Sequence, residues 1–392
     1  MTEDSGRTEG KGLPRTRKKI LFLFSDTGGG HRSAAEAIVE ALEERFPGAF
    51  ACELVDVFRE YAPRPLDRMP DLYPSMTRVP AAWGVGYRVS NGRRRVRALE
   101  RTLWPYVRRA ARRLVAERHP DLYVSVHPLL NHPVLRALGS ERPPFMTVVT
   151  DLVTAHSFWY APGVDECLVP TEAARERALQ TGLEADRVHV VGLPVSRAYC
   201  GPDVDPAEAR RKLGWPLEVP MVLLVGGGEG MGPLFPTARA LARSGASLGL
   251  AVVAGRNQAL RERLEAVAWE VPALIYGFER RLPLMMQAAS ILVTKAGPGT
   301  MTEAMNAGLP MVLYSRLPGQ EEGNVTFAET QGVGIWAPGP RRTVEAVAGL
   351  LSDEARLSQM QQRCRQIAKP EAARLIAERI ARRVGVQVAS EP

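Results

Sequence analysis

The segment at residues 291–324 restricts the possible fold more than any other part of this chain. It opens with the apolar run ILV, which predicts a buried strand, and continues through the glycine turn KAGPG into a helix expected at 300–307. Such a unit forms an anion site, because free N–H groups and the positive end of the helix dipole face one spot. We therefore predict a phosphate-binding βα unit of a parallel sheet.

Glu303, within this helix, has two candidate roles. The sequence TMTE at 300–303 fits a capping box, in which Glu303 bonds back to its own helix start. The loop GQEEGN at 319–324 follows the next apolar strand, and loops after adjacent parallel strands open on the same edge of a sheet. A phosphate cradle beside amide and carboxylate groups suits a nucleotide joined to a sugar, so Glu303 is also a candidate ligand-binding residue.

The bulk properties indicate a two-domain protein without a membrane span. A chain of 392 residues with 45% hydrophobic content is long enough for about two domains, and it contains no run of 18 apolar residues. Residues 1–18 are polar and basic, so we expect a disordered leader there. The cysteines have neither metal-binding nor disulfide spacing, which is typical of a reducing cytoplasm, and they lie at Cys52, Cys167, Cys200 and Cys364.

The first half begins with a similar unit. The apolar run at 20–24 leads into SDTGGGH at 25–31, where Gly29 and Gly30 let the backbone approach a ligand and place His31 at a helix start. The helix dipole disfavours an imidazolium there, so we expect His31 to be neutral and able to accept a proton. The alternative is an ordinary polar helix start beside a tight turn.

Asp151 and His156 follow another predicted strand, at 145–149, and should lie on the same edge as His31. Three titratable groups that converge on one edge form a catalytic pattern, although a single histidine of this kind is usually structural. We therefore treat all three as candidate catalytic residues.

The second half opens with the strand 221–225 and the loop GGGEGMGP at 226–233. This loop is a second phosphate-cradle candidate, although it matches neither the Gly-x-Gly-x-x-Gly nor the lysine-bearing P-loop pattern. Its candidate donor-binding residues are Gly228, Gly230 and Met231.

Residues 58–118 interrupt the alternation of strands and helices. The part at 88–118 holds eleven arginines against two glutamates, a net charge of +9. Arginine interleaved with Trp and Tyr suits a membrane surface; nucleic acid is a rival partner, and a solvated basic helix is the simplest alternative. We expect Trp83, Tyr87 and Trp104 to insert into lipid. The residues expected to bind either an acceptor substrate or the membrane are Gly29, Gly30, Pro65, Trp83, Tyr87, Arg93, Arg94, Arg95 and Trp104.

Two doubly wound α/β halves suggest the glycosyltransferase B fold, with two Rossmann-like domains facing across a cleft. The chain resembles the monogalactosyldiacylglycerol synthases and related diacylglycerol glycosyltransferases over roughly residues 18–380. The motifs that carry the resemblance are SDTGGGHRSAAEAI (25–38), TDLVTAHSFWY (150–160), VGLPVS (191–196), GGGEGMGP (226–233) and KAGPGTMTEAMNAGLPMVLYSRLPGQEEGN (295–324). One departure is Ser196 directly after GLPV, where the family often has arginine, so a diphosphate role for Arg197 is not implied.

The resemblance implies roles for individual residues. It implies that His31 is the catalytic base and that Glu303 binds ribose, while Asp151 and His156 stay candidates for base or base orienter because of their predicted place on the sheet edge. It also implies that the diphosphate meets Gly297, Gly299 and Thr300, with Pro298 of the same turn in the donor site. The uracil would meet backbone near Gly277 and Phe278, and the sugar would meet Gln320, Glu321 and Asn324.

We accordingly expect an inverting transferase that moves a hexose, with galactose the first choice, from a UDP-sugar to 1,2-diacylglycerol. UDP is a good leaving group, so one base suffices, and amides and helix termini can stabilise the diphosphate; we expect no metal or cofactor. Expected partners are the UDP-sugar, diacylglycerol and anionic membrane lipid, but not nucleic acid. We expect the protein to be cytoplasmic and peripherally bound to the inner face of the membrane.

The same sequence features are compatible with other functions. They are a glucosyl- or N-acetylglucosaminyl-transferase acting on another lipid, a UDP-sugar 2-epimerase-like isomerase, and a catalytically silent membrane-binding protein. The expected organisation is a leader (1–18), an N-terminal acceptor domain (19–198, with the lipid-facing insertion 58–118), a C-terminal donor domain (207–365) and a C-terminal helix (366–392).

Overall fold

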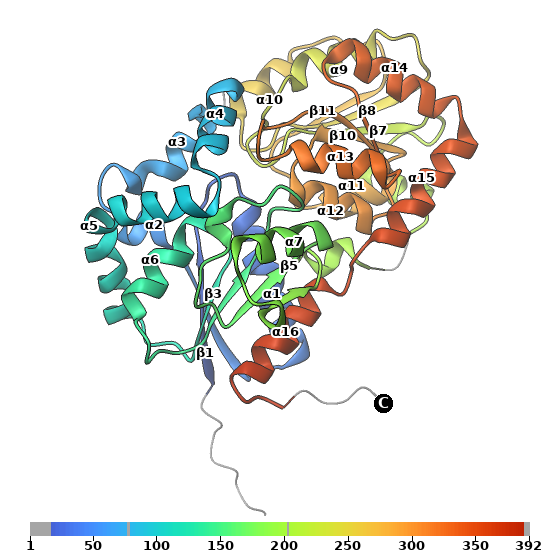
Figure 1. The fold of residues 1–392 in the computed structure, drawn as a ribbon. Coiled ribbons are helices and arrows are strands. Elements are labelled where there is room, and N and C mark those ends of the chain that lie inside the picture. Colours follow the sequence, from blue (N-terminus) through green and yellow to red (C-terminus); the bar gives the residue numbers. More distant parts are fainter. Residues whose placement is uncertain (1–16, 77–78, 202–203, 388–392) are drawn as a thin grey trace, which may run out of the picture.

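The computed structural model describes residues 17–76, 79–201 and 204–387 (Figure 1). Residues 1–16 of the expected leader lie outside the described residues, and Lys18 already belongs to the first strand. The described chain builds two parallel sheets, as predicted. We call the parts built on them the first and the second domain.

The first sheet has six parallel strands in the order β2-β1-β3-β4-β5-β6. Its strands are β1 (Lys18–Phe24), β2 (Phe50–Asp56), β3 (Leu122–Ser125), β4 (Phe145–Val148), β5 (Glu166–Val169) and β6 (Val188–Val190). The chain moves from β1 to β2 on one side and then returns to β3 on the other. The point between β1 and β3 is therefore the topological switch point, where doubly wound sheets bind ligands.

The second sheet also has six parallel strands, in the order β12-β11-β10-β7-β8-β9. Its strands are β7 (Met221–Val225), β8 (Gly249–Val253), β9 (Ala273–Tyr276), β10 (Ile291–Lys295), β11 (Met311–Ser315) and β12 (Gly334–Trp336). Here the switch point lies between β7 and β10. The two glycine loops that the sequence singles out in this half follow these two strands.

Helices cover both sheets. The α-helices are α1 (Gly30–Arg45), α2 (Val57–Tyr61), α3 (Met69–Met76), α4 (Pro80–Ser90), α5 (Arg93–Glu117), α6 (Pro128–Leu138), α7 (Glu172–Thr181), α8 (Pro206–Leu213), α9 (Leu234–Ala242), α10 (Gln258–Glu265), α11 (Leu282–Ala288), α12 (Pro298–Asn306), α13 (Glu322–Thr330), α14 (Pro340–Leu351), α15 (Glu354–Ile367) and α16 (Ala372–Arg383). Short 3-10 helices are η1 (Leu66–Arg68), η2 (Ser157–Trp159), η3 (Ala185–Arg187) and η4 (Arg197–Tyr199). Within the described ranges, no helix combines the length and apolar character that a membrane span requires.

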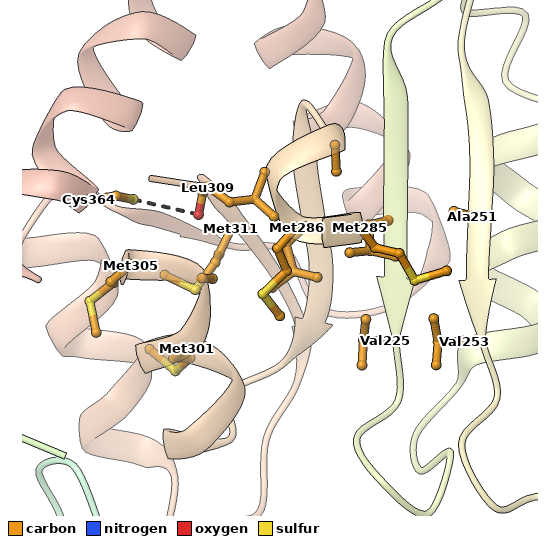
Figure 2. Close-up of a cluster of buried hydrophobic side chains, with 14 of the residues drawn as sticks. Val225, Ala251, Val253, Met285, Met286, Met301, Met305, Leu309, Met311 and Cys364 are labelled. Carbon is orange, nitrogen blue, oxygen red and sulfur yellow. Dashed lines mark hydrogen bonds between the residues drawn. The ribbon is translucent and has the colours of Figure 1, made fainter. Parts of the chain in front are cut away.

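A sulfur-rich core supports the loop after β10 (Figure 2). Met301 and Met305 of α12 are four residues apart and therefore share one helix face, and both are buried beside Met311 and Met286. Because this face is committed to the core, Glu303 lies on the partly exposed side of α12.

The insertion after β2 forms α2 to α5 at one side of the first domain (Figure 1). Helix α5 is 25 residues long and packs against α6, with Val96 and Leu114 buried. At the other end of the chain, α16 returns to the first domain and packs on α1, where Arg45 of α1 pairs with Glu378 of α16 at 3.8 Å. The last helix thus joins the two domains.

Candidate active site

Loops from both domains meet where the carboxyl ends of the two sheets face one another; we call this place the domain junction. The Nε2 group of Gln320 donates to Asp151 Oδ1 at 3.2 Å, and the Gly323 amide donates to Thr154 Oγ1 at 2.9 Å. A Cβ atom on Gly29 would lie 4.0 Å from Arg256 Nη1 of the second domain. The two switch points therefore contribute to one shared site.

The capping-box interpretation of Glu303 is wrong. Helix α12 begins at Pro298 rather than at Thr300, its N-cap is Gly297, and no side chain caps it. Thr300 and Glu303 consequently lie inside the helix, so Glu303 cannot reach back to an N-cap at Thr300.

Glu303 is instead an unpaired carboxylate beside the domain junction. Within the described part of the chain, no group donates a hydrogen bond to it. Burial raises its pKa from 4.5 to about 7. A half-buried acceptor without a protein donor is suited to a ligand that supplies hydroxyl groups.

Lys295, the last residue of β10, forms an ion pair that the sequence did not reveal. Its Nζ lies 2.6 Å from Glu321 Oε1, while Glu321 Oε2 accepts from the Leu317 amide at 2.8 Å. Glu321 is 2% exposed, and both its oxygens are occupied in holding the loop. Because Lys295 Nζ also lies 2.8 Å from the place of a Cβ on Gly297, a cation stands beside the glycine turn. The sequence signal for a cation at this place is a lysine at the end of a strand, directly before a glycine turn.

Gln320 and Asn324 each present one unused oxygen. The amide nitrogen of Gln320 is bound to Asp151, and that of Asn324 donates to the Ala296 carbonyl at 2.9 Å. Gln320 Oε1 and Asn324 Oδ1 are buried and have no hydrogen-bond partner among the described residues. Each of these oxygens can accept from a hydroxyl group.

His31 is the second residue of α1 and lies at the first switch point. Its Nδ1 is 3.0 Å from Thr150 Oγ1, and its ring packs edge-on against His127 with centroids 4.6 Å apart. Burial lowers the pKa of His31 from 6.5 to about 4, although a backbone hydrogen bond with Val126 and the charge of Asp26 oppose this. The lowered pKa favours the neutral ring at neutral pH, and burial is its main cause.

Asp151 lies at the domain junction but is committed to other contacts. Its Oδ2 accepts from Trp159 Nε1 at 2.7 Å, and its Oδ1 accepts from Gln320. Burial raises the pKa of Asp151, while these two hydrogen bonds lower it. Asp151 thus connects the first domain to the loop at 319–324.

His156 does not converge with the other two candidates. Its Nδ1 accepts from the Phe158 amide at 3.1 Å, and its Nε2 lies 3.1 Å from Ser90 Oγ of α4. Its ring also contacts Tyr87 and Phe158. The chain turns after Asp151, so His156 caps η2 and faces the insertion instead of the domain junction.

Arg256, after β8, is a second cation that sequence reasoning missed. Its guanidinium pairs with Glu229 at 2.9 Å and lies over the Phe278 ring at 4.7 Å, and its amide donates to the Gly228 carbonyl. Phe278 is 59% exposed. Arg256 therefore connects the glycine loop after β7 with the residues expected to face uracil.

Gly230 and Met231 have structural roles in the same loop. A Cβ on Gly230 would lie 2.2 Å from the Ala254 carbonyl oxygen, and the Met231 carbonyl accepts from the Tyr314 hydroxyl. Close packing against β8 and β11 thus explains this glycine without a ligand.

The structure places the expected membrane residues differently from the prediction. Trp83 and Tyr87 are half-buried, and Trp104 lies under Arg136 at 4.4 Å. The exposed large apolar side chains of the insertion are instead Leu72, Met76, Val79, Val85, Val89, Leu103 and Tyr106. The three aromatic rings face inward because they pack on neighbouring elements; Tyr73, for example, meets Trp83 edge-on and covers Gly28.

Of the three arginines expected at the membrane, Arg93 and Arg95 contact other parts of the protein. Arg93 lies against Gly182, in a hollow of about 350 Å³ that Arg88 and Arg177 also line, and Arg95 donates to the Arg88 carbonyl. Arg94 is exposed, as are Pro65 and Gly30. Arg197, whose role the sequence left in doubt, pairs with Glu44 of α1.

Comparison with known proteins gives two family-model matches. Residues 31–195 match the model described as monogalactosyldiacylglycerol (MGDG) synthase, and residues 222–380 match the glycosyltransferase family 28 C-terminal domain. A probable MGDG synthase of Nicotiana tabacum is 36% identical, and the alignment covers 95% of this chain and 73% of that protein. MGDG synthase 1 of Arabidopsis thaliana is also 36% identical, with coverage of 91% and 69%.

Solved structures are similar in fold at low sequence identity. S. aureus MnaA with UDP has a TM-score of 0.63 and 15% identity, with coverage of 95% of this chain and 99% of that one. Acinetobacter baumannii MurG has a TM-score of 0.60 and 15% identity, with coverage of 93% and 99%. At this identity the likeness concerns the fold, and it confirms the predicted glycosyltransferase B architecture.

The comparison corrects the expected location. Both plant relatives are named as chloroplastic proteins. The prediction of a cytoplasmic enzyme at the inner face of the membrane is therefore wrong. Scattered cysteines indicate a reducing environment but do not distinguish one such compartment from another.

Proposed function

Because this chain belongs to the monogalactosyldiacylglycerol synthase family, we propose that it transfers galactose from UDP-galactose to the free hydroxyl of 1,2-diacylglycerol. The product is a β-galactosyl diacylglycerol, a membrane galactolipid. The observation that carries this function is similarity over almost the whole chain, since it includes both the first-domain and the second-domain segments of the site.

On the donor side, the diphosphate would lie at the start of α12, against Gly297, Pro298, Gly299 and Thr300. The helix N-terminus supplies free N–H groups, Lys295 lies beside Gly297, and Arg256 lies beside Gly228 of the other glycine loop. These groups would stabilise the negative charge that builds on UDP as the glycosidic bond breaks.

Glu303 would accept hydrogen bonds from the two ribose hydroxyls. Its carboxylate has no donor among the described residues, which supports this assignment. Gln320 Oε1 and Asn324 Oδ1 would accept from galactose hydroxyls, because both oxygens are buried and unpaired within the described structure. Glu321 would act through the loop rather than on the sugar.

On the acceptor side, His31 would take the proton from the diacylglycerol hydroxyl while the oxygen attacks the anomeric carbon. The new C–O bond forms on the face opposite the departing UDP, so the reaction inverts the anomeric centre. A neutral ring is required for this step, and the lowered pKa of His31 provides it.

The insertion would hold the enzyme on anionic lipid. Arg94, Arg97, Arg101, Arg108 and Arg112 recur at helical spacing along one side of α5. All five are exposed, and none takes part in an ion pair or hydrogen bond with another described residue. Exposed cations without a protein partner, in an insertion that also exposes apolar side chains on α3, α4 and α5, suit the interface of an anionic bilayer.

Parallel assays with UDP-galactose, UDP-glucose and UDP-N-acetylglucosamine, each with and without diacylglycerol, test the function. We expect UDP release that requires diacylglycerol, fastest with UDP-galactose, and a galactolipid identified by mass spectrometry. Conversion of a UDP-sugar to an isomer without any lipid would indicate an epimerase instead.

Replacing Glu303 by glutamine should weaken UDP binding by about 1.5–3 kcal/mol, the usual contribution of a hydrogen bond to a charged group. Calorimetric titration at pH 8 measures this with the carboxyl ionised, since its pKa is about 7. The melting temperature should not fall, because Glu303 does not cap α12. Unchanged UDP affinity would rule out the ribose role.

A further inference from the structure

Helix α4 has two different faces. Val85 and Val89, four residues apart, are 55% and 64% exposed. Gly84, Tyr87 and Arg88 follow the spacing of the opposite face, and all three contact the loop of the second domain that carries Gln320. One helix of the insertion therefore lies against the loop expected to receive the sugar.

The contacts between α4 and this loop are close. A Cβ on Gly84 would lie 2.7 Å from Pro318 Cβ, and a Cβ on Gly319 would lie 2.9 Å from the Tyr87 ring. Gly319 has a φ of +82°, so a side chain there would also be strained. Arg88 adds an ion pair with Glu322 at 3.9 Å.

Tyr87 also fixes the first-domain segment that holds the same loop. Its hydroxyl donates to the Thr154 carbonyl, while Thr154 Oγ1 accepts from the Gly323 amide at 2.9 Å. Both ends of the loop at 318–323 are thus held, at one end by Gly84 and Tyr87 and at the other by Thr154. Between them lies Gln320, whose Oε1 is buried and unpaired among the described residues.

We propose that Gly84 and Tyr87 are positioning residues for the donor sugar: they fix the loop at 318–323, and they touch neither substrate. This inference rests on the proposed function, because it assumes that Gln320 meets the sugar of a UDP-sugar. In this proposal, the face of α4 that carries Gly84 and Tyr87 helps to position the donor sugar, whereas the sequence predicted that Tyr87 contacts the membrane.

Gly84 and Gly86 provide a matched pair for the test. Both lie in α4, and a Cβ on Gly86 would meet nothing within 4 Å. Gly84→Ala should displace Pro318 and lower kcat/KM for UDP-galactose about 10- to 100-fold, the range expected for misplacement of about 1 Å. UDP affinity should change less than about twofold, since UDP contacts other loops, whereas Gly86→Ala should leave both quantities unchanged.

Tyr87→Phe keeps the ring but removes the bond to Thr154, so it should lower kcat/KM in the same direction by a smaller factor. Vesicle binding of all three variants, measured by sedimentation, should equal that of the wild type. Equal behaviour of Gly84→Ala and Gly86→Ala, or an equal loss of UDP and UDP-galactose affinity, would overturn the positioning role. A wild-type protein that transfers no galactose would instead count against the proposed function.

Discussion

Alanine in place of His31 is expected to lower turnover by about two to four orders of magnitude, the contribution typical of a general base. UDP affinity should stay almost unchanged, because His31 belongs to the first domain and the proposed nucleotide contacts lie in the second. Steady-state assays with diacylglycerol in mixed micelles, together with calorimetric titration of UDP, separate the two effects.

His156→Ala is the matched control, because the His156 ring faces Ser90 of α4 and not the domain junction. It should affect turnover far less than His31→Ala. Turnover retained in His31→Ala would transfer the role of base to Asp151, a buried candidate base at the domain junction.

The pH dependence of turnover gives a second measurement for the same base. Since the pKa of His31 is lowered to about 4, its base form persists as the pH falls from 8 to about 5 and is lost as the pH falls through 4. Turnover at saturating UDP-galactose should follow this course. A decline centred near pH 6.5, the value of an ordinary histidine, would contradict the assignment.

Glutamine at Arg94, Arg97 and Arg101 together should weaken binding to vesicles that contain phosphatidylglycerol by about 3 kcal/mol, or about 100-fold. This estimate takes about 1 kcal/mol for each basic residue near an anionic surface. These three are preferable to Arg93 and Arg95, which have contacts within the protein. Wild-type binding should be weaker on neutral vesicles and should fall at high salt.

The control variant removes the same charge elsewhere: Arg341, Arg342 and Arg356 are exposed on α14 and α15 of the second domain. It should bind vesicles like the wild type. Activity of the α5 variant on a short-chain acceptor in detergent should be largely retained. Equal losses of activity on vesicles and in detergent would mean that the arginines support the fold or the active site. This outcome would contradict the membrane role.

The sequence by itself determined the local units. Continuous apolar runs such as Ile20 to Phe24 identify strands buried on both faces, and glycine turns at 28–30 and 297–299 mark their carboxyl ends. The two sheets and the placing of His31 at a helix start followed from these patterns, because strand, turn and helix preferences depend on residues close together in the chain.

Only the tertiary structure decided what each side chain at the site contacts. Helix α12 begins two residues earlier than predicted, so Glu303 does not form a capping box. The chain turns after Asp151, so His156 faces α4. Gln320 and Asp151, which meet at the domain junction, are 169 residues apart in the chain. Periodicity shows which side of an element is apolar, but the packing of distant elements determines which partner covers that side, and for this reason Trp83 and Tyr87 face inward while Val85 and Val89 remain exposed.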